Sequence, residues 1–283
     1  MRIFDPHIHM TSRTTDDYER MAAAGVRAVL EPAFWLGQPR TSAGSFTDYF
    51  DSLVGWEPFR ASQFGIRHHC AIALNPKEAN DPRCREVLGL LPRYLAKDGV
   101  VAVGEVGYDS MTPDEDEVFA AQLELAVQHD LPALVHTPHR DKKRGTERTL
   151  DVVKESGIAH GRVLVDHLNE VTVGQVAGTG CWMSFSIYPD TKMSPPRMAA
   201  ILREYGLDRM LVNSAADWGR SDPLLTLRTA EAMLAAGFGE DDVDRVLWRN
   251  PVEFFGQSGR LDLTGTGEPA ATFSGNSILR GGD

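Results

Sequence analysis

The chain has 283 residues, of which 42% are hydrophobic and 24% are charged, with a formal net charge of −11. This length and composition are those of an ordinary globular protein with room for one large core. The negative charge repels polyanions and argues against nucleic acid as the principal partner. No apolar segment approaches the roughly 20 residues that span a bilayer, so we expect a cytoplasmic protein without a membrane partner.

Short apolar runs alternate along the chain with longer amphipathic stretches. The predicted strands are Arg2–His9, Val26–Pro32, Gly65–Leu74, Val100–Val106, Ala133–Thr137, Arg162–His167, Cys181–Tyr188 and Arg209–Asn213. The predicted helices are Asp16–Ala24, Pro82–Ala96, Asp114–His129, Thr146–Ser156, Pro195–Tyr205 and Pro223–Ala236. Alternating strands and helices with nearly continuous apolar strands are typical of a parallel sheet that is covered by helices.

The alternation predicts an α/β fold, and eight such units fit a closed (β/α)8 TIM barrel. The alternative is an open doubly wound sheet, which usually carries a glycine-rich phosphate-binding turn after its first strand. No GxGxxG or GxxxxGK[ST] motif follows Ile3–His9, so the barrel is favoured. We expect the barrel to occupy residues 1–258, and residues 259–283, rich in Gly, Ser and Thr, to form an extended tail.

Residues of metal-ligand type stand at the ends of the predicted strands. They are His7 and His9 in strand one, Glu105 in strand four, His136 in strand five, His167 in strand six, and Asp217 after strand eight. Taken singly, each has an ordinary structural explanation, such as a helix cap, a hydrogen-bonded core histidine or a turn. In a barrel, however, all six would meet at the C-terminal face, where the chemistry of this fold is located. The set therefore predicts a metal site.

This set of motifs resembles the TatD-type metal-dependent hydrolases of the amidohydrolase superfamily. The resemblance covers about the first 256 residues and includes Asn250 to Gly256, which is similar to the segment that closes the barrel in that family. It implies two divalent metal ions, with zinc or manganese expected. One ion would be held by His7, His9 and Asp217, and the other by His136 and His167, with Glu105 between them.

The residue types suit this chemistry. Two divalent ions about 3.5–4 Å apart can activate a hydroxide and polarise the bond to be cleaved. Glu105 has two oxygens with which to bridge the ions, and Asp217 can bind metal and also act as general base. We expect Asp5 either to orient the first two histidines or to have a structural role, and we expect Asp166, beside His167 on a strand, to point away from the metals.

The sequence departs from the family pattern near the substrate. Asn75-Pro76 stands where the family's nucleases have His-Pro, and Ala215-Ala216-Asp217 replaces their Glu-Thr-Asp. Residues 139–148, read as a loop, hold five basic and two acidic residues and could guide an anionic group to the metals. The alternative is a solvated surface loop. His139, Arg140 and Trp218 are the candidate substrate contacts.

We therefore expect a hydrolase that cleaves an ester, phosphoester or amide bond in a small anionic substrate. A deoxyribonuclease, which would make nucleic acid the partner, and a non-catalytic metal-binding barrel are the alternatives. An intact ligand set with a potential general base at Asp217 favours the enzyme, because a structural metal site would fill its coordination sphere with protein. The sequence does not indicate an oligomeric state.

Overall fold

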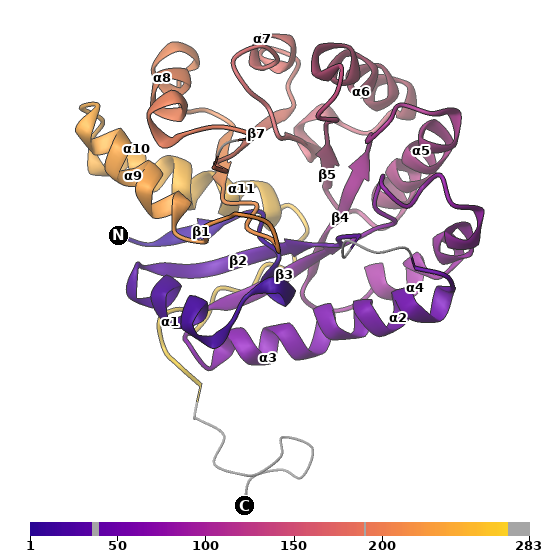
Figure 1. Ribbon diagram of the computed structural model, residues 1–283, viewed down its shortest axis with the longest axis horizontal. Helices are drawn as coiled ribbons and strands as arrows, with labels where there is room; N and C mark the ends of the chain where they lie inside the picture. The colour runs from indigo at the N-terminus through magenta and orange to yellow at the C-terminus, as the bar shows by residue number, and fades with distance from the viewer. Residues whose placement is uncertain (36–39, 190, 271–283) are drawn as a thin grey trace, which may run out of the picture.

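The computed structural model describes residues 1–35, 40–189 and 191–270. Eight strands lie in chain order, each parallel to its neighbour, with helices around them (Figure 1). The strands are β1 (Ile3–Asp5), β2 (Val26–Pro32), β3 (Arg67–Ile72), β4 (Val100–Gly107), β5 (Ala133–His136), β6 (Val163–Asp166), β7 (Trp182–Ser186) and β8 (Met210–Asn213). This arrangement confirms the predicted (β/α)8 barrel.

The helices follow the strands and cover the outside of the barrel. They are α1 (Thr15–Ala23), α2 (Ala43–Asp51), α3 (Glu57–Ser62), α4 (Leu91–Leu95), α5 (Pro113–Gln128), α6 (Lys142–Ser156), α7 (Val173–Val176), α8 (Pro195–Tyr205), α9 (Leu225–Ala235), α10 (Glu240–Asp244) and α11 (Asn250–Gly256). Of the described helices, none is both long and apolar enough to cross a bilayer.

Backbone hydrogen bonds beyond the strand ends join β8 to β1. The amide of Ala215 donates to the carbonyl of His7, and the amide of His9 donates to the carbonyl of Ala216, both at 2.9 Å. These bonds hold the segment after β8 beside His7 and His9, which follow β1. This seam places the predicted strand-one and strand-eight site residues next to each other.

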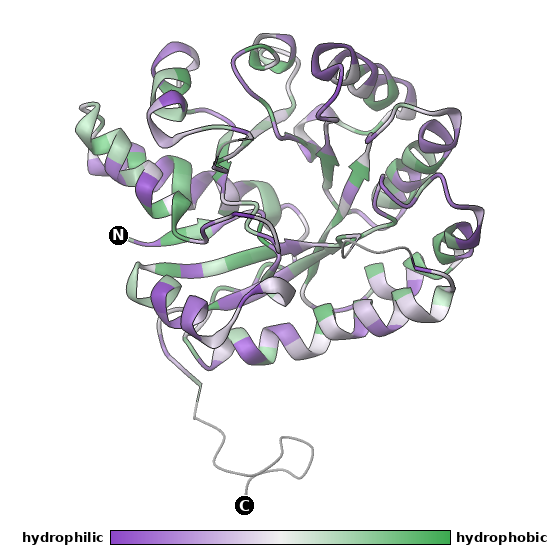
Figure 2. Cartoon of the chain, in the orientation of Figure 1, coloured by the Kyte–Doolittle hydropathy of each residue, from purple (hydrophilic) through white to green (hydrophobic). Residues whose placement is uncertain are grey.

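The core has two layers. The larger lies between the sheet and the helices, whose green apolar faces turn toward the strands in Figure 2. The smaller fills the barrel interior, where Phe4 of β1 packs against Phe255 of α11 with ring centroids 5.8 Å apart. Side chains of each strand point alternately into the interior layer and the exterior layer. Because both layers are apolar, the strands read as continuous hydrophobic runs.

The segment after α11 lies against the barrel. Leu261 and Leu263 pack on the interior core layer, and the imidazole Nε2 of His69 donates to the carbonyl of Asp262 at 3.0 Å. The amide of Gly267 donates to the carbonyl of Gly65 at 2.7 Å. The described part of this segment, which includes a turn over residues 264–267, thus packs on the barrel, whereas residues 271–283 lie outside the described residues.

Two local predictions were wrong, and one helical segment was not predicted. Residues 142–148 of the predicted basic loop form the first turns of α6, and so most of that segment is helical. Within it, Thr146 Oγ1 donates a hydrogen bond to the carbonyl of Lys142. The predicted helix Pro82–Ala96 is a 3-10 helix over Pro82–Gly89 followed by α4, because Pro92 interrupts the hydrogen bonding. The helical segment from α2 through α3 was not predicted.

Candidate metal centre

The two histidines of the first strand segment lie just beyond β1. Pro6 has no amide hydrogen, which ends the strand at Asp5, and regular pairing with β2 returns where the amide of Ile8 donates to the carbonyl of Leu30 at 3.0 Å. His7 and His9 still turn to the same side, since their Nε2 atoms lie 3.2 Å apart. The strand was therefore shorter than predicted, but the expected convergence of the two rings is present.

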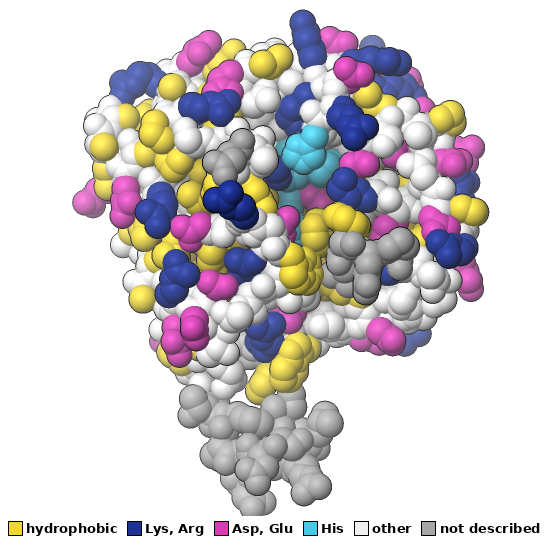
Figure 3. All heavy atoms as spheres, viewed as in Figure 1, with side chains coloured by type: hydrophobic (Ala, Val, Ile, Leu, Met, Phe, Trp, Pro, Cys, Tyr) yellow, Lys and Arg dark blue, Asp and Glu magenta, His cyan; other side chains and the backbone are white. Residues whose placement is uncertain are grey.

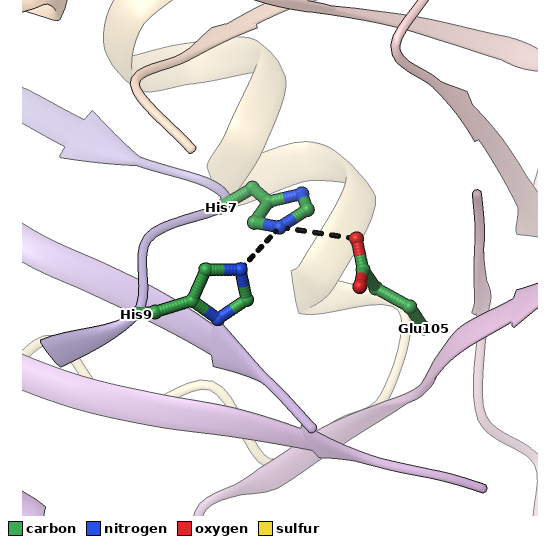
Figure 4. A group of neighbouring side chains, drawn as sticks. All are labelled: His7, His9 and Glu105. Carbon is green, nitrogen blue, oxygen red and sulfur yellow. Dashed lines mark hydrogen bonds and ion pairs between the residues drawn. The ribbon is translucent and has the colours of Figure 1, made fainter. Parts of the chain in front are cut away.

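Glu105 of β4 lies at the centre of a group of four buried histidines. Its Oε1 is 3.2 Å from His7 Nε2, 3.5 Å from His136 Nδ1 and 3.4 Å from His167 Nε2. Figure 4 shows Glu105 and His9 meeting at the Nε2 of His7, from opposite walls of the barrel. The structure thus brings five of the six predicted metal ligands to one point, with the carboxylate between the early and late histidines.

Asp166 contradicts the expectation that it points away from this group. Its Oδ2 accepts a hydrogen bond from His7 Nδ1 at 2.6 Å, and its Oδ1 accepts from the amide of His167 at 2.6 Å and from Asn213 Nδ2 at 3.0 Å. The physical reason is that Asp166 has the same strand parity as Leu164, which lies in the interior layer, while His167 leaves the strand with a left-handed φ of 61° and turns to the same site. Both Asp166 and His167 can therefore serve the same site.

Hydrogen bonds fix the orientation of the other central side chains. Ser186 Oγ lies 2.6 Å from Nδ1 of His167, and Asn75 Nδ2 donates to Oε2 of Glu105 at 2.9 Å. Asp5 acts on the backbone, because its Oδ1 accepts from the amides of His7 at 3.3 Å and Ser214 at 3.2 Å. Of the two readings of Asp5, the structure therefore shows the structural one.

Burial and charge decide the protonation of the group. Burial would raise the pKa of Glu105, but the surrounding imidazoles of His7, His136 and His167 hold it well below its usual value, so the carboxylate is anionic. Burial lowers the pKa of His9 and of His167 well below the usual value. Neutral imidazoles and an anionic carboxylate are the forms that bind a divalent cation.

The residues fit a metal ion on their own geometry. Three groups each place their ligand atoms within 4.8 Å of one another, and two of them, His7 with His9 and Glu105, and Glu105 with His136 and His167, share the glutamate. The buried atoms His9 Nδ1 and His136 Nε2 have no hydrogen-bond partner among the described residues. Buried nitrogen atoms without partners are costly in a protein unless a ligand uses them.

Asp217, the sixth predicted ligand, lines the same cavity but belongs to none of these three groups. Its Oδ1 accepts hydrogen bonds from the Tyr188 hydroxyl at 2.9 Å and from the Gly219 amide at 2.8 Å. Among the described residues, no donor bonds its second oxygen, Oδ2. Its roles as ligand and as base stay predictions.

A cavity of about 570 Å³ opens above the histidines. Figure 3 shows histidine side chains in this hollow, with lysine and arginine side chains on the surrounding face. The lining residues are His7, His9, Phe34, Trp35, Lys77, Glu105, His136, His139, His167, Tyr188, Thr191, Lys192, Ala215 and Asp217. This volume is that of a site for a small molecule.

The three predicted substrate contacts differ in their positions. His139 lines the cavity, whereas Arg140 and Trp218 do not. Trp218 is 54% exposed and stacks on Phe34, which in turn stacks on His9 with ring centroids 4.0 Å apart. Trp218 is thus connected to the site through its stacking on Phe34, and all three contacts stay predictions.

Sequence reasoning missed several residues that serve the site. Asp166 was expected to point away, although its strand parity with the interior residue Leu164 indicates the opposite, and Ser186 gives no signal of its own. Tyr188 ends the predicted strand Cys181–Tyr188 and Lys192 follows it, so both could have been found by asking which polar residues stand at the C-terminal face after β7.

Comparisons with known proteins agree with this geometry. Residues 4–256 match the family described as "TatD related DNase". An uncharacterised metal-dependent hydrolase of Methanocaldococcus jannaschii is 26% identical over 89% of this chain and 99% of its own length. A putative deoxyribonuclease of Danio rerio is 29% identical over 74% of this chain and 78% of its own length.

A solved structure shows the same architecture. The TatD-like protein of Archaeoglobus fulgidus is 27% identical, covers 89% of this chain and 99% of its own, and superposes with a TM-score of 0.74. The family match spans most of the chain. The chain belongs to the TatD family and is a metal-dependent hydrolase of the amidohydrolase superfamily.

Proposed function

We propose that the protein is a binuclear hydrolase that cleaves an ester, phosphoester or amide bond in a small anionic substrate. The observation that carries this proposal is the position of Glu105, whose Oε1 lies within 3.5 Å of a ring nitrogen of His7, His136 and His167. A carboxylate shared by two groups of ligands is what a bridged pair of ions needs. A single site would need only one of the groups.

The proposed ligands divide between two ions. His7, His9 and Asp217 would hold one, His136 and His167 would hold the other, and Glu105 would lie between them. Zinc and manganese suit ligands that combine imidazole with carboxylate. When bound, such ions make water a stronger acid and polarise the bond to be cleaved.

The protein itself supplies orientation and a proton acceptor. The carboxylate of Asp166 keeps the hydrogen of His7 on Nδ1, which leaves the lone pair of Nε2 for a ligand. Tyr188 and Gly219 hold one oxygen of Asp217, and Oδ2 is left to take a proton from water and return it to the leaving group. Asp217 is therefore the proposed general base.

Two features support a small anionic substrate. The cavity volume of about 570 Å³ suits a metabolite, and Lys77 and Lys192 both line the cavity, so its wall carries positive charge in a chain whose net charge is −11. The second candidate is a deoxyribonuclease, which is favoured by the description of the matching family and by the zebrafish relative.

Metal analysis tests the binuclear centre. We expect about two equivalents of zinc or manganese per chain, and less in His7→Ala and in His136→Ala, as measured by elemental analysis after careful purification. His129→Ala is the matched control, because His129 lies at the end of α5 and does not line the cavity. Protein without metal, or with stoichiometric magnesium alone, would refute the proposal.

Turnover measurements on the metal-loaded protein decide between the candidate functions. We expect hydrolysis of p-nitrophenyl esters or of p-nitrophenyl phosphodiesters that exceeds cleavage of single- or double-stranded DNA. Activity on DNA alone would establish the deoxyribonuclease instead. Full metal content without turnover of any substrate would leave the non-catalytic metal-binding barrel.

A further inference from the structure

Lys192 lies between β7 and α8 and lines the cavity beside the group formed by Glu105, His136 and His167. Its Nζ is 3.2 Å from Nδ1 of His167 and 5.4 Å from the ring centroid of Tyr188. The ammonium is therefore held within reach of whatever occupies the cavity. Tyr188, through its bond to Asp217, connects Lys192 to the proposed general base.

Once His167 binds a metal through Nε2, its Nδ1 cannot accept a hydrogen bond from Nζ of Lys192. Nε2 of that ring faces Glu105, so a ligand at Nε2 leaves the ring hydrogen on Nδ1. That hydrogen is donated to Ser186 Oγ, 2.6 Å away. The ammonium of Lys192 then faces another N–H group, to which it cannot donate.

The other cations near the cavity already have partners. Nζ of Lys77 lies 2.6 Å from Asp109 Oδ1, and Nζ of Lys142 donates to Thr137 Oγ1 at 3.0 Å and to the Pro138 carbonyl at 3.3 Å. In the described part of the chain, no carboxylate lies within 4.0 Å of Lys192 Nζ. Of the two lysines that line the cavity, Lys77 thus has a carboxylate at ion-pair distance and Lys192 has none among the described residues.

We propose that Lys192 binds an anionic oxygen of the substrate, on a phosphoryl or carboxylate group next to the bond that is cleaved. Such an oxygen gives the ammonium the acceptor that the protein does not supply, and charge-assisted hydrogen bonds of this kind are the strong ones. The inference rests on the proposed hydrolase and names the residue that selects a charged substrate. In this proposal Lys192 guides the anionic group to the metals, a role that the sequence suggested for the basic residues at the start of α6.

Inorganic phosphate is the first probe, because its binding requires no turnover. In the metal-loaded protein, Lys192→Met should weaken phosphate binding about 10- to 100-fold by isothermal titration calorimetry. Lys192→Arg should recover most of that loss. Lys154→Met is the matched control, at an exposed lysine of α6 that does not line the cavity, and should change binding less than about threefold.

A pair of substrates tests the same charge during catalysis. Lys192→Met should raise KM for an anionic ester, such as the mono-p-nitrophenyl ester of glutaric acid or p-nitrophenyl phosphate, about tenfold or more. KM for neutral p-nitrophenyl acetate should be unchanged. A larger effect on the phosphate ester than on the carboxylate ester identifies a phosphoryl group as the natural anion, and the reverse identifies a carboxylate.

Two results would overturn the inference. One is unchanged phosphate affinity in Lys192→Met, and the other is a loss of metal from this variant, which would show that Lys192 only supports His167. If wild-type protein turns over no substrate but Lys192→Met still weakens phosphate binding, the anion site stands and the hydrolase proposal fails.

Discussion

Oδ2 of Asp166 lies 2.6 Å from Nδ1 of His7, while Nε2 of the same ring lies 3.2 Å from Glu105. The imidazole is thus held between two buried carboxylates. Burial alone would lower the pKa of His7, but Glu105 and Asp166 together raise it. A ring oriented in this way presents one fixed nitrogen to the centre, which is the usual arrangement of a histidine that binds metal.

Asp166→Asn should weaken metal binding about 10- to 100-fold, because an amide supports the ring hydrogen of His7 less strongly than a carboxylate. Competition with a chelator of known affinity measures the effect. Asp208→Asn, at an exposed aspartate paired with Arg245, is the control and should leave metal affinity unchanged. Wild-type affinity in correctly folded Asp166→Asn would show that the hydrogen bond does not tune the site.

Asp217→Asn should separate metal binding from proton transfer. The amide keeps an oxygen donor and the same shape, so metal content should fall only modestly, while turnover should fall about 10²–10⁴-fold as for loss of a general base. Elemental analysis and steady-state kinetics on the same preparation provide the two readouts. If the variant with its metals in place keeps nearly wild-type turnover, the base lies elsewhere, and His139 is the next candidate.

A carboxylate at the end of β4 makes reconstitution independent of carbon dioxide. A lysine in this position would need carbamylation before it could bridge two ions, whereas Glu105 is already anionic. Recovery of metal content and activity from apoprotein should therefore be the same with and without added bicarbonate. A marked requirement for bicarbonate would mean that Glu105 is not the bridging group.

The position of the strand-end residues could be predicted because the C-terminal ends of all eight strands lie at one face of the barrel. Buried parallel strands read as apolar runs, and a polar residue that closes such a run must lie at the C-terminal face. His136 ends β5, His167 follows β6, and Glu105 stands two residues before the end of β4. The pattern needed no knowledge of side-chain angles, and so their convergence could be predicted.

The inward turn of His167 could not be predicted, because it depends on the left-handed φ of that residue, whereas the inward direction of Asp166 follows from its strand parity with Leu164. The helical segment from Ala43 to Ser62 was missed for a different reason. Gly44 and Gly55 weaken its helical pattern, and the five residues Ser52–Trp56 form a π-helical turn that shifts the apolar periodicity between α2 and α3. In both cases, tertiary contacts decide the conformation against the local pattern.

The contact between His69 and the segment after α11 predicts a pH dependence of stability. Burial lowers the pKa of His69 to about 4 from its usual 6.5. The unfolded chain therefore binds a proton near pH 6.5 that the folded protein does not bind until about pH 4. The free energy of unfolding is therefore highest above pH 6.5 and falls as the pH falls toward 4. The decrease is up to about 3 kcal/mol, since one pKa unit corresponds to about 1.4 kcal/mol.

His69→Gln removes the titrating group and keeps a side-chain N–H that can reach the carbonyl of Asp262. Urea unfolding at several pH values between 4.5 and 7.5 should show a smaller loss of unfolding free energy with falling pH in the variant than in the wild type. His160→Gln is the control, a partly buried histidine that bonds the carbonyl of Thr179 and should leave the slope unchanged. Equal slopes in wild type and His69→Gln would mean that His69 takes up its proton without disturbing the packing of the segment on the barrel.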